Sequence, residues 1–147
     1  MSRHIGYGIE RLLAIDGATV SDINVLIPQL KPSWEPMSED GLVVLLASES
    51  RVYVARDGRR IVGLTVMVPH RHLPGLRYHV EDVVIAAEHR GHGLARRLLE
   101  FAMQDVPGSV LSFDLRSHAS RTHAHRLYAS LGFRPSDTTV FRLDAAN

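Results

Sequence analysis

Apolar residues recur along the chain with two periods, one typical of strands and the other of helices. Alternation at the start predicts a first strand near residues 5–13. A spacing of three and four residues then predicts a helix that begins at Ser21 or Asp22 and that Pro28 kinks or shortens. A second helix is expected after Ser38, because the acidic residues behind this N-cap favour a first turn.

Strand patterns dominate the middle of the chain. Two runs rich in β-branched residues flank Asp57-Gly58, a dipeptide typical of tight hairpin turns. After an expected loop at residues 69–78, residues 79–86 predict a buried strand, and a helix follows from about Gly93 to Asp105. The remaining predicted elements are a strand at 110–115, a helix at 120–131 that Gly132 ends, and a closing strand at 134–143.

This order of elements, β-α-α-β-β-β-α-β-α-β, predicts a mixed α/β fold. A hairpin leads into strands that alternate with helices, so a partly antiparallel central sheet flanked by helices is expected. The length of 147 residues suits a single domain over residues 1–147. In open α/β sheets, ligands bind beyond the carboxyl ends of strands, which directs attention to the residues after the strand at 79–86.

Composition narrows the classes of function. The net charge of +1 is too mild for a nucleic-acid binder, which would carry a basic stripe. The absence of cysteine excludes disulfides and a thiol nucleophile. No apolar run reaches the roughly 18 residues of a membrane span, and the N-terminus lacks the apolar core of a secretory signal. We therefore expect a cytoplasmic enzyme or binding domain.

Nine histidines raise the question of a metal site. The closest pairs, His70/His72 and His123/His125, are spaced i, i+2, a spacing that points two rings apart on a helix. No HExxH motif and no cysteine ligand is present. Surface histidines are the simpler interpretation, and no metal is expected.

The stretch EHRGHGLARRLLEFAMQ, residues 88–104, places two glycines where a helix must begin. A helix N-terminus exposes unpaired N–H groups and a partial positive charge, and glycine lets a phosphate approach them. Arg90 and Arg96 add positive charge. Residues 90–95 therefore predict a cradle for a phosphate or pyrophosphate. A loop that only uses glycine to turn tightly is the alternative.

Two common nucleotide motifs do not match this stretch. The P-loop requires Gly-Lys-Ser/Thr, which is absent, and the dinucleotide fingerprint requires glycine where Arg96 stands. The chain instead resembles the GNAT superfamily of acetyl-coenzyme A-dependent N-acetyltransferases. Arg90-x-x-Gly93-x-Ala95 fits its motif Gln/Arg-x-x-Gly-x-Gly/Ala after a strand. Its second motif, Leu-Tyr-x-x-x-Gly-Phe, is matched in AHRLYASLGF by Leu127, Tyr128, Gly132 and Phe133.

The resemblance implies a GNAT-like fold, acetyl-coenzyme A as cosubstrate and transfer of the acetyl group to a primary amine by direct attack. It implies that the cradle holds the coenzyme A pyrophosphate and that the preceding strand pairs with the pantetheine arm. A backbone N–H of that strand would polarise the thioester carbonyl. The residues so assigned to the cofactor are Val83, Val84, Ile85, Arg90, Gly91, His92, Gly93, Leu94, Ala95 and Arg96.

Catalytic roles follow from the same resemblance. Tyr128 is the expected acid that protonates the leaving thiolate, with a packed aromatic as the alternative. Glu81 is the expected base, directly or through a water, and could instead anchor a cationic amine or be structural. Its neighbour Asp82 is a second carboxylate, and a neighbouring carboxylate can raise the pKa of Glu81. Asp82 is also a candidate contact to the substrate. Strand alternation would place the two carboxylates on opposite faces.

Three points stay open at this stage. Arg121 or His125 stands where relatives carry a cofactor-binding asparagine, and a solvated helix face is the alternative. Trp34 could stack on the acceptor or cover the core, and the acceptor could be a small amine, an amino acid, or a protein lysine or N-terminus. A catalytically inactive acyl-coenzyme A-binding module is the second functional class, and a phosphoryl-transfer enzyme a distant third. The strand expected at 138–143 could pair with a second copy, so a homodimer is left open.

Overall fold

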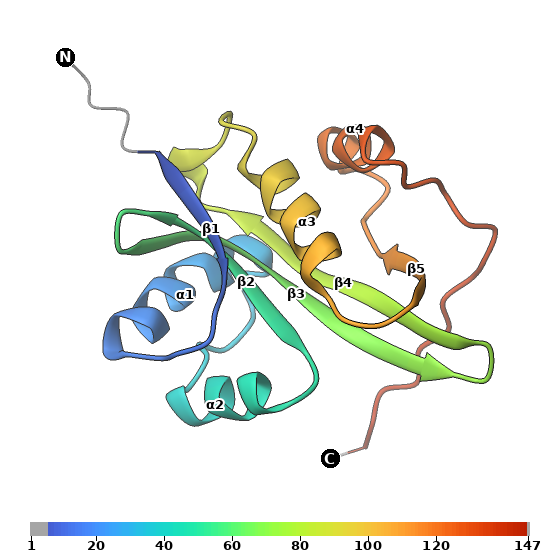
Figure 1. Cartoon of the computed structure of the whole chain (residues 1–147), viewed down its shortest axis with the longest axis horizontal. Coiled ribbons are helices and arrows are strands. Elements are labelled where there is room, and N and C mark those ends of the chain that lie inside the picture. The colour runs from blue at the N-terminus through green and yellow to red at the C-terminus, as the bar shows by residue number, and fades with distance from the viewer. Residues whose placement is uncertain (1–5, 147) are drawn as a thin grey trace. The chain divides into compact units, whose positions relative to one another are not determined.

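The computed structural model describes residues 6–146 and divides into two compact units, one ending at Arg116 and the other beginning at Ser117. The first contains the sheet with three α-helices, and the second contains one helix (Figure 1). Among residues 6–146, no helix is long and apolar enough to cross a bilayer. The elements are β1 (Tyr7–Arg11), α1 (Gly17–Leu30), α2 (Glu39–Ala47), β2 (Arg51–Asp57), β3 (Arg60–His72), β4 (Gly75–Ile85), the 3-10 turn η1 (Ala87–His89), α3 (Leu94–Asp105), β5 (Val110–Leu115) and α4 (Thr122–Ser130).

The five strands form one mixed sheet in the order β1-β2-β3-β4-β5. The pairs β1–β2, β2–β3 and β3–β4 are antiparallel, and the pair β4–β5 is parallel. The hairpin predicted at Asp57-Gly58 joins β2 to β3, and Gly58 adopts the left-handed φ of 61° that such turns require. The mixed sheet flanked by helices confirms the predicted fold class.

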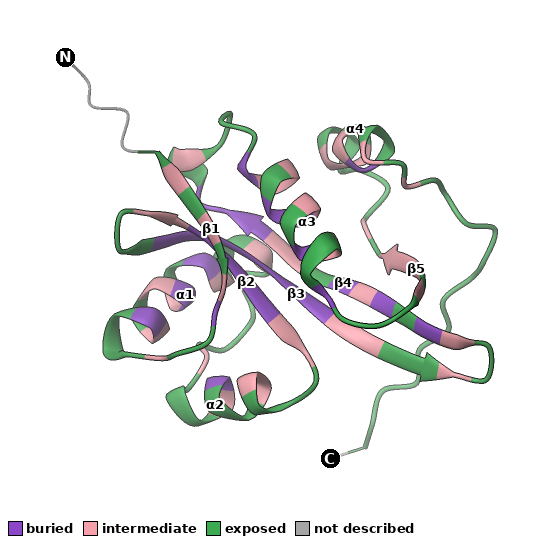
Figure 2. Ribbon diagram, in the orientation of Figure 1, coloured by how far each residue is buried: buried purple, intermediate pink, exposed green. Residues whose placement is uncertain are grey.

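The core lies on both faces of the central strands. Residues 52–55 of β2 are buried in succession, which requires cover on each side of the sheet. Helices α1 and α2 cover one face and α3 covers the other (Figures 1 and 2). At the end of α3, Asp105 accepts a hydrogen bond of 2.9 Å from the buried Tyr53 hydroxyl and pairs with Arg51 at 3.1 Å. This network fixes α3 against the sheet.

Helix α1 begins earlier than the sequence pattern indicated. Asp16 is its N-cap and accepts a 2.8 Å hydrogen bond from the Thr19 backbone N–H, while the Asp16 N–H donates to the Thr19 hydroxyl at 3.1 Å. This reciprocal pair satisfies two donors at once, so the predicted start at Ser21 or Asp22 is wrong. Asp22 instead accepts a bond from the Ile61 backbone N–H at 3.0 Å. The helix ends two residues after Pro28.

The loop expected at residues 69–78 is largely strand. β3 continues through Pro69 to His72, and β4 starts at Gly75, so only a tight turn separates them. Pairing with β2 ends at Met67, which leaves β3 with one hydrogen-bonded neighbour from there on. Proline is tolerated on such an open edge, because no partner needs the missing N–H.

The closing strand expected at residues 134–143 is absent, and the prediction is wrong there. Residues 134–146 have no regular structure, and Val140, Phe141 and Leu143 are exposed. A strand needs a hydrogen-bonded neighbour, and the unit from Ser117 onward contains α4 but no strand among its described residues. The proline and aspartate of this segment also disfavour extended pairing.

Candidate functional site

The start of α3 forms an open cluster of backbone donors. Gly93 is the N-cap residue with φ 70°, and Gly91 has φ 86°, both in the left-handed region that glycine enters without strain. The first helical bond runs from the Arg97 N–H to the Gly93 carbonyl at 3.1 Å. Within residues 6–146, the N–H groups of 91–95 have no backbone or side-chain acceptor. A Cβ added to either glycine would meet no atom within 4 Å, so the surrounding space is free for a ligand.

The arginines of this segment are held by protein groups. The Arg90 Nε donates to the Ile85 carbonyl at 3.1 Å, and its guanidinium also reaches the Gln29 side chain at 3.4 Å. Arg96 pairs with Glu100 one turn along α3 at 2.9 Å. Both guanidinium groups are thus bound to acceptors of the protein, and the Glu100 carboxylate offsets the charge of Arg96. Binding of phosphate by residues 90–96 stays a prediction.

The carboxyl half of β4 has a free edge. β4 pairs with β5 only from Leu76 to Val80, so among the described residues 81–85 have β3 as their one neighbouring strand, and the Ile85 carbonyl also accepts the bond from Arg90. Val84 and Ile85 are buried and Val83 is half-buried. This free edge leads directly to η1 and the glycines. An extended ligand could add to it as another strand would, which is the geometry expected for a pantetheine arm.

A β-bulge interrupts β4 at this edge. The register places Glu81 opposite Val66 and Val84 opposite Leu64, so two residues of β4 oppose Thr65 alone. Asp82, inside the bulge, has φ 52°, the one left-handed conformation among the described residues other than glycine. Such strained residues cluster at functional sites. The expectation that alternation places Glu81 and Asp82 on opposite faces assumed a regular strand, and it does not apply here.

The two adjacent carboxylates differ in environment. Asp82 is half-buried, and burial, followed by the charge of Glu81, raises the pKa of the Asp82 carboxyl above its usual value. Glu81 is exposed. Glu81 as the base stays a prediction, and the raised pKa of the half-buried Asp82 makes Asp82 a second candidate for that role.

In the second unit, Tyr128 is 8% exposed and packs edge-on against Phe133, with ring centroids 6.1 Å apart. Burial raises the pKa of the Tyr128 hydroxyl, partly offset by the charge of Arg121. The Phe133 N–H bonds the Tyr128 carbonyl at 3.0 Å across Gly132, whose φ of 96° ends α4 as predicted. Tyr128 is therefore held in place and kept protonated.

The other candidate residues lie at element ends. Arg121 is the N-cap of α4, and the His125 N–H bonds its carbonyl at 3.1 Å, so the two side chains lie one turn apart on one helix face. Trp34 is 45% exposed in the loop between α1 and α2. Asn24 holds this loop through two bonds with the Met37 backbone, at 2.7 and 3.0 Å. Cofactor and acceptor roles for these residues stay predictions.

Within residues 6–146, no group of three His, Asp or Glu side chains is arranged so that it could hold a metal ion. His70, His72 and His79 are near one another on the β3–β4 hairpin, with ring centroids 5.4 and 6.1 Å apart. His89 accepts or donates a 2.9 Å hydrogen bond with the Tyr7 hydroxyl, beside the cradle.

Two residues that contact the cradle segment were missed by sequence reasoning. Tyr7 bonds His89 from β1, and Gln29 bonds Ala87 and Arg90 from α1. Neither belongs to a motif, since each contact joins residues far apart in the chain. For Gln29, the sequence showed only a polar side chain near the expected end of a helix.

Solved structures of acetyltransferases share this fold. An aminoglycoside acetyltransferase from an uncultured soil metagenomic sample, in complex with trehalose, has a TM-score of 0.82 at 16% identity and covers 96% of this chain and 97% of its own. AAC(6')-Iy, in complex with the bisubstrate analogue CoA-S-monomethyl-acetylneamine, has a TM-score of 0.75 at 12% identity, with 96% and 99% covered.

Sequence comparison gives the family. A family model described as an acetyltransferase (GNAT) domain matches residues 48–135, more than half of the chain, and the protein therefore belongs to the GNAT acetyltransferase family. N-alpha-acetyltransferase 40 of Saccharomyces cerevisiae is 36% identical over 63 residues, covering 37% of this chain and 22% of that protein. The chain thus spans about a fifth of the length of this curated relative.

Proposed function

We propose that this protein transfers the acetyl group of acetyl-coenzyme A to a primary amine by direct attack, within the domain of residues 1–147. The observation that carries the proposal is the free edge of β4 at residues 81–85, which ends at a helix N-terminus with both glycines in the left-handed region. Family membership and the structural neighbour bound to a coenzyme A conjugate support it.

The chain's own groups would bind the cosubstrate in two segments. Main-chain groups of Val83, Val84 and Ile85 would pair with the pantetheine arm, and one N–H would polarise the thioester carbonyl. The N–H groups of residues 91–96 would hold the pyrophosphate at the positive end of α3. Arg121 or His125 would add a contact from α4. No metal is required for these steps.

Deprotonating the acceptor is the larger chemical task. A lysine-like amine has a pKa of about 10.4, so its neutral form is scarce by roughly three powers of ten at pH 7. Asp82, half-buried in the bulge with a raised pKa, would act as the base directly or through a water, with Glu81, the base predicted from sequence, as the alternative. The exposed Glu81 would attract and orient the cationic amine. Trp34 would contact the acceptor from the loop between α1 and α2.

Protonating the departing thiolate is the smaller task, since a cysteine-like thiol has a pKa of about 8.5. Tyr128 would donate this proton. Its raised pKa keeps the hydroxyl protonated at physiological pH, so it is available as a donor throughout the working range.

The proposal is tested by measuring thiol release from acetyl-coenzyme A over a panel of small amines, amino acids, lysine peptides and peptide N-termini. We expect release with at least one class and a product heavier by one acetyl group. Binding of acetyl-coenzyme A without release over the whole panel would instead support a catalytically inactive acyl-coenzyme A-binding module.

Replacing Asp82 and Glu81 by their amides in two separate variants distinguishes the base from the residue that anchors the amine. Asp82→Asn should lower kcat by about 10²–10⁴-fold, the usual contribution of a general base. Because the pKa of Asp82 is raised, wild-type kcat/KM should fall as the pH drops through that raised value, and this acidic limb should disappear in the variant. Glu81→Gln should raise KM for the amine and leave kcat within about threefold, since only attraction of a cation is lost. The reverse assignment is indicated if the limb disappears in Glu81→Gln and persists in Asp82→Asn.

A further inference from the structure

Gln29, in the last turn of α1, contacts the segment that leads into the cradle. Its side-chain oxygen accepts a 3.1 Å hydrogen bond from the Ala87 backbone N–H and a 3.4 Å bond from the Arg90 guanidinium. Arg90 is the first residue of the cradle motif, and its Nε donates to the Ile85 carbonyl at 3.1 Å. One amide oxygen of α1 thus connects to both ends of the turn between β4 and the glycines.

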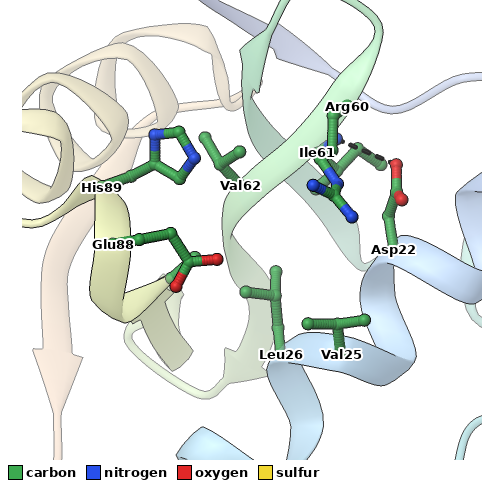
Figure 3. Close-up of a pocket in the computed structure, with 9 residues that line it drawn as sticks. Asp22, Val25, Leu26, Arg60, Ile61, Val62, Glu88 and His89 are labelled. Carbon is green, nitrogen blue, oxygen red and sulfur yellow. Dashed lines mark hydrogen bonds between the residues drawn. The ribbon is translucent and has the colours of Figure 1, made fainter.

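A small open pocket of about 30 Å³ lies between this turn and α1, and Figure 3 shows Val25 and Leu26 of α1 on one side of it and Glu88 and His89 on the other. Leu26 and Ala86 also line it and are buried, so apolar packing contributes to this contact beside the hydrogen bonds. Within residues 6–146, the hydrogen bonds from α1 to residues 86–90 both end on the Gln29 oxygen. Loss of the Gln29 side-chain oxygen would therefore leave residues 86–90 without a hydrogen bond to α1 among the described residues.

The opposite side of the turn is held from β1. The Tyr7 hydroxyl and His89 Nδ1 form a 2.9 Å hydrogen bond, and the Arg97 guanidinium donates to the Tyr7 carbonyl at 3.1 Å. The His92 ring also packs against Tyr7, with centroids 5.5 Å apart. The turn is therefore supported on two sides, from β1 and from Gln29.

We propose that Gln29 is a positioning residue for coenzyme A: it fixes the turn at residues 86–90 so that the glycine N–H groups point at the pyrophosphate. The inference rests on the proposed function and extends it to α1. Gln29 lies just before the loop at residues 31–38, which carries Trp34. The same helix end thereby joins the cofactor cradle to the loop assigned to the acceptor.

The test is calorimetric titration of coenzyme A into wild type, Gln29→Leu, Gln29→Glu and the control Ser21→Ala. Ser21 is an exposed α1 residue whose hydroxyl bonds only the Gly17 carbonyl of its own helix. We expect Gln29→Leu to weaken binding about 3- to 10-fold, the effect of losing two exposed hydrogen bonds. Gln29→Glu should bind within about twofold of wild type, since a carboxylate oxygen accepts both bonds and pairs with Arg90. Ser21→Ala should bind as wild type.

Two further readouts separate positioning from a general loss of stability. In Gln29→Leu the Ala87 amide should exchange hydrogen faster, while Tm stays within a few degrees of wild type. In acetyl transfer, KM for acetyl-coenzyme A should rise while kcat stays within about twofold. Equal affinity of Gln29→Leu and wild type, or a Gln29→Glu variant as weak as Gln29→Leu, would overturn the inference. A wild-type protein that does not bind coenzyme A would overturn the proposed function itself, whereas the Ala87 exchange rate reports on the turn without any ligand.

Discussion

Gly93→Ala should weaken coenzyme A binding by about 10- to 100-fold, as measured by calorimetry. Gly93 has φ 70°, a conformation that alanine adopts only with strain, so relaxation would rotate the N–H groups at the start of α3 away from the pyrophosphate. The new methyl group would also project into the free space where a ligand must approach. Loss of one bond to a charged group, worth about 1.5–3 kcal/mol, accounts for this range.

The chain contains a matched control for this change. Gly58, in the turn between β2 and β3, has φ 61° and likewise no atom within 4 Å of an added Cβ. Gly58→Ala should therefore cost a similar amount of stability, about 1 kcal/mol, and leave coenzyme A affinity unchanged. Equal affinities in the two variants would show that the start of α3 does not bind the cofactor.

Tyr128→Phe should lower kcat by about 10²–10⁴-fold, the usual contribution of a general acid, and leave KM for acetyl-coenzyme A within about threefold. Phenylalanine keeps the edge-on contact with Phe133 and removes only the hydroxyl. Because burial raises the pKa of Tyr128, the acid is protonated below that raised value, and wild-type kcat should fall only as the pH rises through it. This alkaline limb should be absent from the variant.

The control for Tyr128→Phe is Tyr53→Phe. Tyr53 is another buried tyrosine with a raised pKa, about 12, and its hydroxyl bonds the exposed Asp105 at the end of α3, outside the proposed site. Its replacement should lower stability by about 1 kcal/mol and leave kcat within about twofold. If Tyr128→Phe retains wild-type kcat with an unchanged circular dichroism spectrum, the hydroxyl has no catalytic role.

Local patterns were sufficient for the elements that depend on local interactions. The hairpin at Asp57-Gly58, the helix that starts after Gly93 and the helix end at Gly132 each depend on a glycine in a left-handed conformation. A few adjacent residues determine these conformations, so sequence alone places them. The resemblance to the GNAT superfamily rested on two such local segments, and it is confirmed by the family match.

Features that depend on distant partners were not predictable. Pro69 was assigned to a loop, because the sequence does not show that β2 stops pairing at Met67 and leaves an open edge. The closing strand was expected at residues 134–143, although the sequence of that segment does not show whether a neighbouring strand is available. In both segments the presence or absence of a pairing partner, which the local sequence does not show, decides whether a strand forms.

The arrangement at the proposed site shows the same limit. The bulge at Asp82 depends on the register between β3 and β4, which the sequence of β4 alone does not reveal. The sequence identified two adjacent carboxylates, but their burial decides which one has the raised pKa. Gln29 acts across 58 residues of chain to reach Ala87, so no motif could include it.

The central claim is that main-chain donors at residues 91–96 bind the pyrophosphate of coenzyme A. The most direct test is calorimetric titration of the wild-type protein with coenzyme A, with pantetheine, which lacks the pyrophosphate together with the adenosine 3′-phosphate, and with inorganic pyrophosphate. The account predicts saturable binding of coenzyme A with a Kd in the micromolar range, at least about tenfold tighter than that of the pantetheine fragment, and competition by pyrophosphate. Equal affinity for the fragment and the intact coenzyme, or no binding of either by folded protein, would contradict it.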